Sequence, residues 1–255
     1  MKLNFLGTGS CFADDHASAF FVTDENDLVL IDCSEQTFKR LKNEFELFKY
    51  RSIFIYITHT HPDHISGLSS LIFYAYLALK KHMTVVAPSS YVGEDLKTLL
   101  KIEGVENYMY TLAVTGDYLD FLTARSFPCI PNKALGISVL TEHVPTLKYK
   151  CFGYVFSIDK QNIVYTGDTN TLNPFLVYLK KGSKLYVDTS VLHKTDAHLY
   201  LDDMLPTLKD LVSKGIEIYL MHLDDEVLTK NLVANIPGIE VVEAFKSEKS
   251  DTHMF

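Results

Sequence analysis

The stretch Thr58-His59-Thr60-His61-Pro62-Asp63-His64 places three imidazoles and one carboxylate directly after the apolar run SIFIYI at positions 52–57. The run predicts a buried strand. In an extended segment, His59 and His61 point to the same side because they are two positions apart. Ligands in α/β proteins commonly bind where strands end. A histidine-rich surface loop is the alternative, but His-x-His-x-Asp-His after a strand is a specific pattern for metal binding.

Three further metal-type residues follow strand-like runs elsewhere in the chain. His143 comes after GISVLTE, Asp168 lies in IVYTGDT, and His222 ends IEIYLMH. The ligands within 59–64 are too crowded for one closed tetrahedral site, so we expect two metal ions with ligands from several segments. His143 or His222 alone would be an ordinary hydrogen-bonded histidine, but their repeated placement after strands makes them candidate ligands.

Length and composition limit the class of protein. The chain has 255 residues, 47% of them hydrophobic, which suffices for the core of one large domain or of two tightly packed halves. Its net charge is −8, with 24 Lys and Arg against 32 Asp and Glu. Proteins that bind long nucleic acids use Lys and Arg to neutralise phosphates, so we expect no long nucleic-acid partner.

The sequence shows no pattern of membrane insertion or secretion. Its longest apolar run, residues 71–79, is too short to cross a bilayer, and the N-terminus lacks the pattern of a secretory signal. The four cysteines, at positions 11, 33, 129 and 151, form no CxxC pair, which argues against a disulfide framework. These features predict a cytoplasmic protein without a membrane partner.

Short β-branched and aromatic runs alternate with helical patterns along the chain, which predicts a compact α/β fold. The expected strands are residues 2–6, 19–23, 28–32, 52–57, 83–87, 137–141, 153–158, 163–166, 184–187 and 216–221. The expected helices, marked by apolar residues at helical spacing, are residues 35–48, 67–79, 93–102 and 203–213.

These motifs resemble those of metallo-β-lactamase-fold hydrolases, and within that superfamily those of RNase Z-like phosphodiesterases. The matches are Phe5-Leu6-Gly7-Thr8-Gly9 to FLGTG, Ile31-Asp32-Cys33-Ser34-Glu35 to IDCGE, His59–His64 to HxHxDH, His143 followed by Gly153-Tyr154, Thr166-Gly167-Asp168-Thr169 to SGDT, and His222 to the last histidine. Ser34 replaces the usual glycine of a turn. The resemblance covers nearly the whole chain and implies one domain, residues 1–255, with a four-layer αβ/βα sandwich of two mixed sheets flanked by helices.

The resemblance also implies a two-metal centre. The implied ligands are His59, His61 and His143 for one ion, Asp63, His64 and His222 for the other, and Asp168 as the bridge. Zinc suits imidazole and carboxylate ligands best, and manganese or iron also fit such sites. The implied reaction is attack on phosphorus by a hydroxide that bridges the metals, with Asp63 orienting the water or accepting its proton.

An acidic residue and a non-ligand histidine complete the catalytic site of RNase Z-like enzymes, and Asp188 and His198 match them here. A histidine held by a carboxylate can stay protonated near neutral pH and act as a general acid. The alternative is structural: Asp188 would cap a strand end, and His198 would lie at the start of a helix. His193 is a competing candidate for the acid.

The segment between His143 and Asp168 is too short for the long arm with which bacterial tRNA 3′-processing enzymes grip their substrate. With the acidic composition, this favours a small nucleotide, most simply a 3′,5′-cyclic mononucleotide. Arm-less relatives with this activity include the anti-Pycsar phosphodiesterases, which are usually homodimers, so a homodimer is expected here. The alternatives are a tRNA 3′-processing endonuclease (RNase Z), a metal-dependent lactonase or thioesterase, and a non-catalytic binding module.

Two other segments offer substrate contacts. Lys148 and Lys150 flank Tyr149 just beyond His143 and could touch a phosphate, although lysines in a loop are commonly just solvated. The stretch 108–127 carries Tyr108, Tyr110, Tyr118 and Phe121, whose rings could stack on a base. Core packing or a dimer contact explains these aromatic residues equally well.

Overall fold

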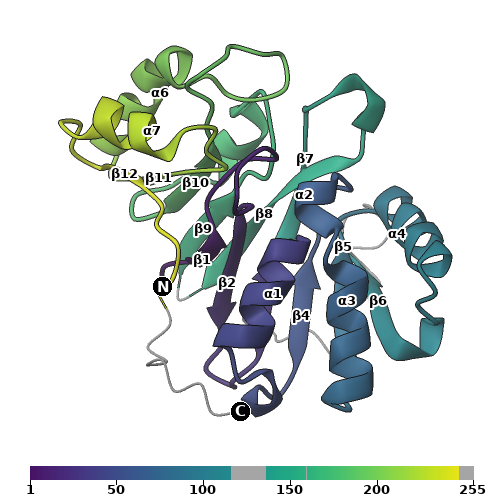
Figure 1. Cartoon of the computed structure of the whole chain (residues 1–255). Coiled ribbons are helices and arrows are strands. Elements are labelled where there is room, and N and C mark those ends of the chain that lie inside the picture. Colours follow the sequence, from purple (N-terminus) through teal and green to yellow (C-terminus); the bar gives the residue numbers. More distant parts are fainter. Residues whose placement is uncertain (116–135, 159, 247–255) are drawn as a thin grey trace.

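The computed structural model describes residues 1–115, 136–158 and 160–246. In this part of the chain, two six-stranded sheets pack face to face, and helices cover their outer faces (Figure 1). Tyr118 and Phe121, two of the aromatic residues considered as base-stacking groups, lie outside the described residues. The layers are those of the metallo-β-lactamase αβ/βα sandwich that the sequence predicts.

The first sheet has the strand order β1-β2-β3-β4-β5-β6. Its strands are β1 (Asn4–Gly7), β2 (Ser18–Val22), β3 (Leu28–Ile31), β4 (Ile53–Tyr56), β5 (Met83–Ala87) and β6 (Tyr110–Val114). The first three strands pair antiparallel, and β3 to β6 pair parallel. The helices on this side are α1 (Glu35–Glu44), α2 (Pro62–Ile65), α3 (Leu68–Phe73) and α4 (Ser90–Ile102).

The second sheet repeats the mixed pattern with the order β12-β11-β10-β9-β8-β7. Its strands are β7 (Gly136–Thr141), β8 (Cys151–Ile158), β9 (Gln161–Tyr165), β10 (Lys184–Asp188), β11 (Glu217–Met221) and β12 (Ile239–Val241). β7 to β9 pair antiparallel, and β9 to β12 pair parallel. The helices α6 (Leu201–Ser213) and α7 (Glu226–Val233) belong to this half.

Strand β4 shows why the site lies between two buried layers. Its side chains alternate: Ile53 and Ile55 pack in the cluster beneath the helices, whereas Phe54 and Tyr56 pack against the second sheet. The ring of Tyr56 meets that of Tyr154 edge to face, with centroids 5.1 Å apart. Burial on both faces holds β4 rigidly, so the residues that follow it are positioned accurately.

Several element boundaries differ from the sequence predictions. The helix expected over 35–48 ends at Glu44, because Phe45 turns to an extended conformation and its ring packs on Phe20 with centroids 5.1 Å apart. The helix expected over 67–79 is α3 followed by a π-helical turn, Tyr74–Ala78. Packing of Phe45 thus ends the first of these helices earlier than its periodicity predicts.

Four short helices and strands were not predicted: α2, β6, α7 and β12. β6 lies in the stretch that was considered for base stacking, and its Tyr110 is buried in the core. Tyr108 is 60% exposed and its ring lies 5.7 Å from that of Tyr76. Core packing therefore explains Tyr110 in this stretch. The described cysteines, Cys11, Cys33 and Cys151, are free thiols.

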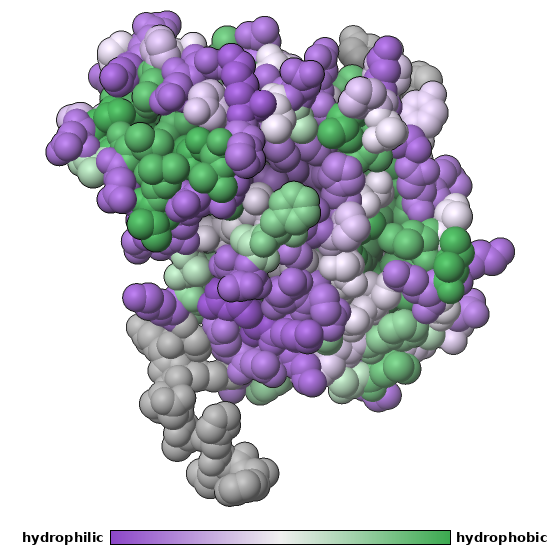
Figure 2. Space-filling view, turned by 45° about the horizontal axis from the view of Figure 1, so that its top comes forward, coloured by the Kyte–Doolittle hydropathy of each residue, from purple (hydrophilic) through white to green (hydrophobic). Residues whose placement is uncertain are grey.

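The face of the molecule drawn in Figure 2 is mostly polar, with local apolar areas. In Figure 2, hydrophobic side chains gather over the lobe that carries α6 and α7. Val227 and Leu232 of α7 are exposed there at 72% and 44%. Among the helices of the described residues, none combines the length and the apolar character that a membrane span needs.

Candidate metal centre

The seven predicted ligands meet where strand ends of the two sheets converge. They come from the segment after β4 (His59 and His61), from α2 (Asp63 and His64), and from the residues that follow β7 (His143), β9 (Asp168) and β11 (His222). All of them are buried except His61, which is half-buried. Pro62 begins α2, where its fixed φ suits the first helical position, and this turn brings Asp63 and His64 beside the two histidines that precede it.

The seven side chains form two groups that share one carboxylate. The first group is His59, His61, His143 and Asp168, and the second is Asp63, His64, Asp168 and His222. Within each group one ligand atom from every residue lies within 4.8 Å of the others. The structure therefore brings together the two ligand sets that the resemblance implied, with Asp168 between them.

Unpaired buried atoms test whether these groups suit a metal. His59 Nε2, His64 Nε2 and Asp168 Oδ1 are buried and form no hydrogen bond within the described structure. Leaving polar atoms buried without a partner is costly. Nitrogen and oxygen donors aimed at one point satisfy that need when they bind a divalent ion.

The separations between donor atoms give a second test. His64 Nε2 lies 3.3 Å from Asp168 Oδ1, and His222 Nε2 lies 3.4 Å from Asp168 Oδ2. In the other group, His61 Nδ1 and His143 Nε2 are 3.3 Å apart. Two atoms bound tetrahedrally to one zinc ion, each about 2.0–2.1 Å from it, would be roughly 3.3 Å apart. These three separations therefore match those of atoms bound to a common metal ion.

Four of the histidines are held through Nδ1, which leaves Nε2 facing the centre. Their partners are Thr58 Oγ1 for His59 at 3.0 Å, Asp32 Oδ2 for His64 at 2.8 Å, the Ala197 carbonyl for His143 at 2.7 Å, and Asp188 Oδ1 for His222 at 3.2 Å. Such outer contacts fix the orientation of a metal-binding imidazole and raise its basicity.

Asp32 is a residue of the site to which the sequence motif assigned no role. Its carboxylate accepts hydrogen bonds from the Thr58 backbone N–H and hydroxyl, both at 2.8 Å, as well as from His64. Burial raises the pKa of Asp32, and the contacts with His64 and Thr58 oppose this effect. Its backbone is left-handed, with φ 60°, a strained conformation for a non-glycine residue that is typical of functional sites. The signal in the sequence was its place in the IDCSE motif.

The carboxylates and histidines of the site shift each other's pKa values. Burial favours the neutral carboxyl of Asp168, but His222 and His64 outweigh it and hold the pKa of Asp168 well below its usual range. Burial likewise opposes charge on His64, and Asp168 and Asp32 raise the pKa of His64 well above its usual value. The carboxylate is therefore ready to bind a cation, whereas His64 must release a proton to do so, which makes metal uptake pH-dependent.

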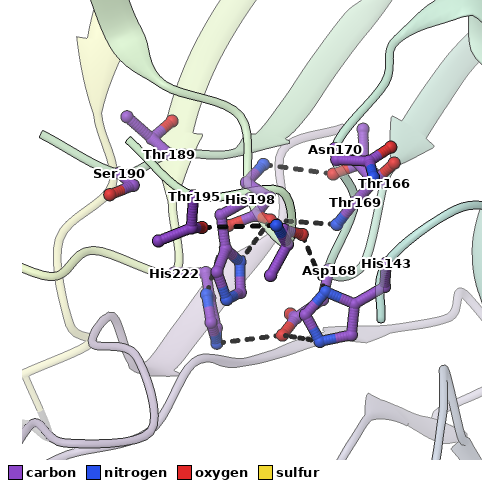
Figure 3. Close-up of polar contacts among 12 residues, drawn as sticks. His143, Thr166, Asp168, Thr169, Asn170, Thr189, Ser190, Thr195, His198 and His222 are labelled. Atoms are coloured by element: carbon purple, nitrogen blue, oxygen red, sulfur yellow. Dashed lines mark hydrogen bonds and ion pairs between the residues drawn. The ribbon is translucent and has the colours of Figure 1, made fainter. Parts of the chain in front are cut away.

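His198 lies beside His143 and His222 of the two groups (Figure 3), and Asp188 lies together with His198 and His222. His198 Nδ1 donates to Asp188 Oδ2 at 2.8 Å, and its ring stacks on that of His222 with centroids 5.1 Å apart. The His198 side chain remains 23% exposed. Burial lowers the pKa of His198, but the charge and hydrogen bond of Asp188 outweigh it and raise the pKa.

The structural alternative for His198 does not match the geometry, whereas Asp188 does lie at a strand end. His198 lies in the loop before α6 and not in the helix, which begins at Leu201. Asp188 ends β10 and contacts His198, His222 and the backbone N–H of Thr169. The competing His193 is exposed, and its backbone carbonyl accepts a hydrogen bond from the Ser190 hydroxyl. Of the two histidines, His198 is therefore the one beside the donor groups.

The loop between β1 and β2 closes one side of the centre. Ser10 N donates to the carbonyl of Leu223, and Leu223 N donates to Thr8 O, both at 2.9 Å. A side chain on Gly7 would come within 2.2 Å of the His16 carbonyl, so a glycine is required at that close approach. The Gly7-Thr8-Gly9 segment is thus extended and paired beside Leu223, and the tight turn expected there lies just after it, where Ala13 N donates to Ser10 O at 3.0 Å.

The curated relatives of this chain are ribonucleases Z. The enzyme of Methanococcus maripaludis is 30% identical over 153 residues, which cover 58% of this chain and 48% of that protein. The enzyme of Listeria monocytogenes is 30% identical over 111 residues, 41% of this chain and 35% of that protein. The chain therefore matches about half, or less, of the length of these relatives.

Solved structures share the fold across nearly the whole chain at low sequence identity. A diphosphatase of the PhnP family is 18% identical with a TM-score of 0.69, covering 98% of this chain and 97% of that one. Human tRNase Z, short form, is 17% identical with a TM-score of 0.64, covering 97% of both chains. Zn²⁺-bound PqqB from Methylobacterium extorquens is 13% identical with a TM-score of 0.71, covering 96% and 99%.

One family model, described as anti-Pycsar protein Apyc1, matches residues 1–243, a span that holds every ligand of the two donor groups and both Asp188 and His198. The sequence motifs, the double-sheet fold and this match agree. The chain belongs to the Apyc1 family of RNase Z-like proteins with the metallo-β-lactamase fold.

Proposed function

We propose that this protein is a dinuclear-metal phosphodiesterase that hydrolyses 3′,5′-cyclic mononucleotides. The observation that carries the proposal is the joint placement of two donor groups sharing Asp168 and of the Asp188–His198 pair beside them. The first arrangement suits cations that bind a phosphoryl group, and the second suits a proton donor. Membership of the Apyc1 family supports the same chemistry.

The residues that would hold the ions are the seven of the two donor groups. When bound, two divalent ions supply an activated water and neutralise negative charge on the phosphoryl oxygens. Asp63 Oδ2 lies 3.2 Å from His64 Nε2 and 3.3 Å from His222 Nε2, at the inner edge of the second group. Those contacts offset the effect of burial and hold the pKa of Asp63 far below its usual value. Asp63 is thus an ionised carboxylate that can bind a cation and orient a water.

His198 is positioned to protonate the departing oxygen. Its Nδ1 hydrogen bonds to Asp188, which leaves Nε2 for the substrate. As the water oxygen bonds to phosphorus and gives one proton to Asp63, the bond from phosphorus to the ribose oxygen breaks, and that oxygen takes the proton of His198. Asp63 then releases its proton to solvent, from which His198 is reprotonated. The product is a linear nucleoside monophosphate with a free hydroxyl, so atoms and charge balance.

Bacterial tRNA-processing enzymes carry a gripping arm between the two motifs that here hold His143 and Asp168. The same segment is short in this chain, which supports a small substrate. Between His143 and Asp168, the described residues form a 3₁₀ turn (Pro145–Leu147) and the hairpin of β8 and β9. The net charge of −8 also disfavours a long nucleic acid. Zinc is our proposal for the metal because the donors are imidazole and carboxylate groups.

The test is chromatographic. Purified, metal-replete protein is incubated with a panel of 3′,5′-cyclic mononucleotides, and formation of linear monophosphates is followed, with His61→Ala and Asp168→Ala as inactive controls. Turnover that is lost in both variants would support the proposal. Bound metal with no cleavage of any cyclic mononucleotide would overturn the substrate assignment, and cyclic oligonucleotides and lactones would be assayed next.

The similarity to ribonucleases Z favours a second candidate, a tRNA 3′-processing endonuclease. A single clean cut at the 3′ end of a precursor tRNA, abolished by the same two substitutions, would establish it. The expected homodimer stays a prediction, and light scattering on the eluting protein measures it directly.

A further inference from the structure

A cavity of about 520 Å³ adjoins the metal centre on the side of His143. His143 belongs both to the first donor group and to the lining of this cavity. A ligand could therefore hold a phosphate at the donor groups and extend into the cavity without a break. Pockets of about 300–1,000 Å³ are typical of small-molecule sites.

The lining of the cavity has the character of a nucleoside site and not of an anion site. Leu140, Val144, Leu147 and Pro174 form its apolar part. Glu142, Asp196 and Lys148 lie on its polar part, so the carboxylates of the lining outnumber its lysine. Two carboxylates repel a phosphate but accept hydrogen bonds from the N–H groups of a base or the hydroxyls of ribose. This side therefore suits the uncharged part of a nucleotide.

Tyr149 provides an aromatic surface at this cavity. Its side chain is 60% exposed, and its backbone is left-handed with φ 67°. That conformation belongs to the third position of a turn that Lys150 N–H closes by donating to Leu147 O at 2.9 Å. The ammonium of Lys148 lies over the Tyr149 ring, 5.1 Å from its centroid. The neighbouring Lys150 is paired with Asp95 at 2.5 Å and so has a structural partner.

We propose that this cavity, named here the Tyr149 cavity, receives the nucleobase and ribose of the substrate, with Tyr149 as the stacking surface for the base. This inference rests on the proposed function in that it takes the phosphate to lie at the two donor groups. The Lys148 ammonium, which lies over the Tyr149 ring, is displaced when a base stacks on that face. Stacking tolerates every base because each has a π-face, so Tyr149 determines affinity for nucleosides in general.

A second cavity of about 620 Å³ is the competing location. It is lined by His198, Tyr200 and Met204, and shares Asn170 and Asp196 with the Tyr149 cavity. Its lysine, Lys194, is paired with Asp203 at 2.5 Å. Tyr200 lies just before α6. Because it is only partly exposed, it offers a smaller surface for stacking than Tyr149. Tyr200 is therefore the matched residue with which to test the assignment.

Calorimetric titration of the metal-replete protein with 5′-AMP and with ribose 5-phosphate isolates the contribution of the base. The wild-type protein should bind 5′-AMP at least about tenfold more tightly than ribose 5-phosphate, which is the scale of one stacked base. Tyr149→Ala should bring this ratio close to one, and Tyr149→Phe should preserve it because stacking needs no hydroxyl. Tyr91→Ala, at a tyrosine 65% exposed on α4, is the surface control and should leave the ratio unchanged.

The outcomes separate this inference from the proposed function. An unchanged ratio in Tyr149→Ala, or a ratio that collapses in Tyr200→Ala instead, overturns the assignment of the base even if the wild-type protein cleaves cyclic mononucleotides. Equal wild-type affinities for the two ligands overturn it as well. Conversely, a Tyr149-dependent ratio in a protein that cleaves no cyclic mononucleotide upholds the base site and refutes the proposed reaction.

Discussion

The carboxylate of Asp188 joins two histidines of different function. Its Oδ2 accepts a hydrogen bond from His198 Nδ1 at 2.8 Å, while its Oδ1 lies 3.2 Å from Nδ1 of His222. One residue thus orients a candidate metal ligand and also stabilises the charged form of a candidate acid. Substitution of Asp188 should therefore affect both proton transfer and metal binding.

His198→Ala should lower the turnover of a cyclic mononucleotide about 10²- to 10⁴-fold, the usual contribution of a general acid. The loss should be much smaller for a p-nitrophenyl phosphodiester, because nitrophenolate departs without a proton. Metal content, measured by mass spectrometry, should match that of the wild-type protein. His193→Ala is the control, and equal losses with both leaving groups would contradict the role of His198.

The activity should fall as pH rises through the pKa of His198. Asp188 raises that pKa above its ordinary value near 6.5, and a proton donor is competent only below its pKa. The turnover number should therefore hold to a higher pH than an isolated histidine would permit and then decline. In Asp188→Asn the decline should move to lower pH, and a pH profile that is unchanged by this substitution would refute the assignment.

Asp32→Asn should weaken metal binding about 10- to 100-fold, the typical effect of removing an outer-shell partner. The substitution weakens the contact that fixes His64 and alters those to Thr58. Competition with a chromophoric chelator measures the change. Asp27→Asn removes another buried carboxylate, which is bound to Arg51 at 2.8 Å, and should leave metal affinity unchanged.

Removal of metal should lower the melting temperature. The apo-protein keeps buried donor atoms without hydrogen-bond partners, and a ligand that binds only the folded state adds stability by mass action. Thermal unfolding with and without a chelator tests this. His61→Ala, with one donor fewer, should show a smaller difference between the two conditions, whereas an equal difference would indicate that the chelator acts elsewhere.

Tyr154→Phe should destabilise the fold by about 1–2 kcal/mol. The Tyr154 hydroxyl donates to the Ile57 carbonyl at 2.7 Å across the buried sheet interface, and its loss leaves that carbonyl unpaired. Urea unfolding measures the change, and Tyr91→Phe on the surface should be neutral. A neutral Tyr154→Phe would mean that the contact does not couple the segment before His59 to the second sheet.

The local sequence was sufficient to determine the alternation of strands and helices and to identify seven candidate ligands. Short-range chemistry explains this success: strand periodicity depends on neighbours two apart, and His59 to His64 lie within one strand end and one turn. The resemblance to known motifs then supplied the grouping of the ligands. The elements that were missed, α2, β6, α7 and β12, are short, and their local patterns are weak.

Only the tertiary structure distinguished His198 from His193, because the two lie in one loop and differ only in what they meet across the fold. The same holds for Asp32, whose partner His64 lies 32 positions away in the chain, and for the Tyr149 cavity, which β7, the loop after it and the segment after β9 build together. Contacts of this kind depend on how the two sheets pack. The sequence therefore determined which residues can bind a metal, and the packing of the sheets decided which other residues lie beside them.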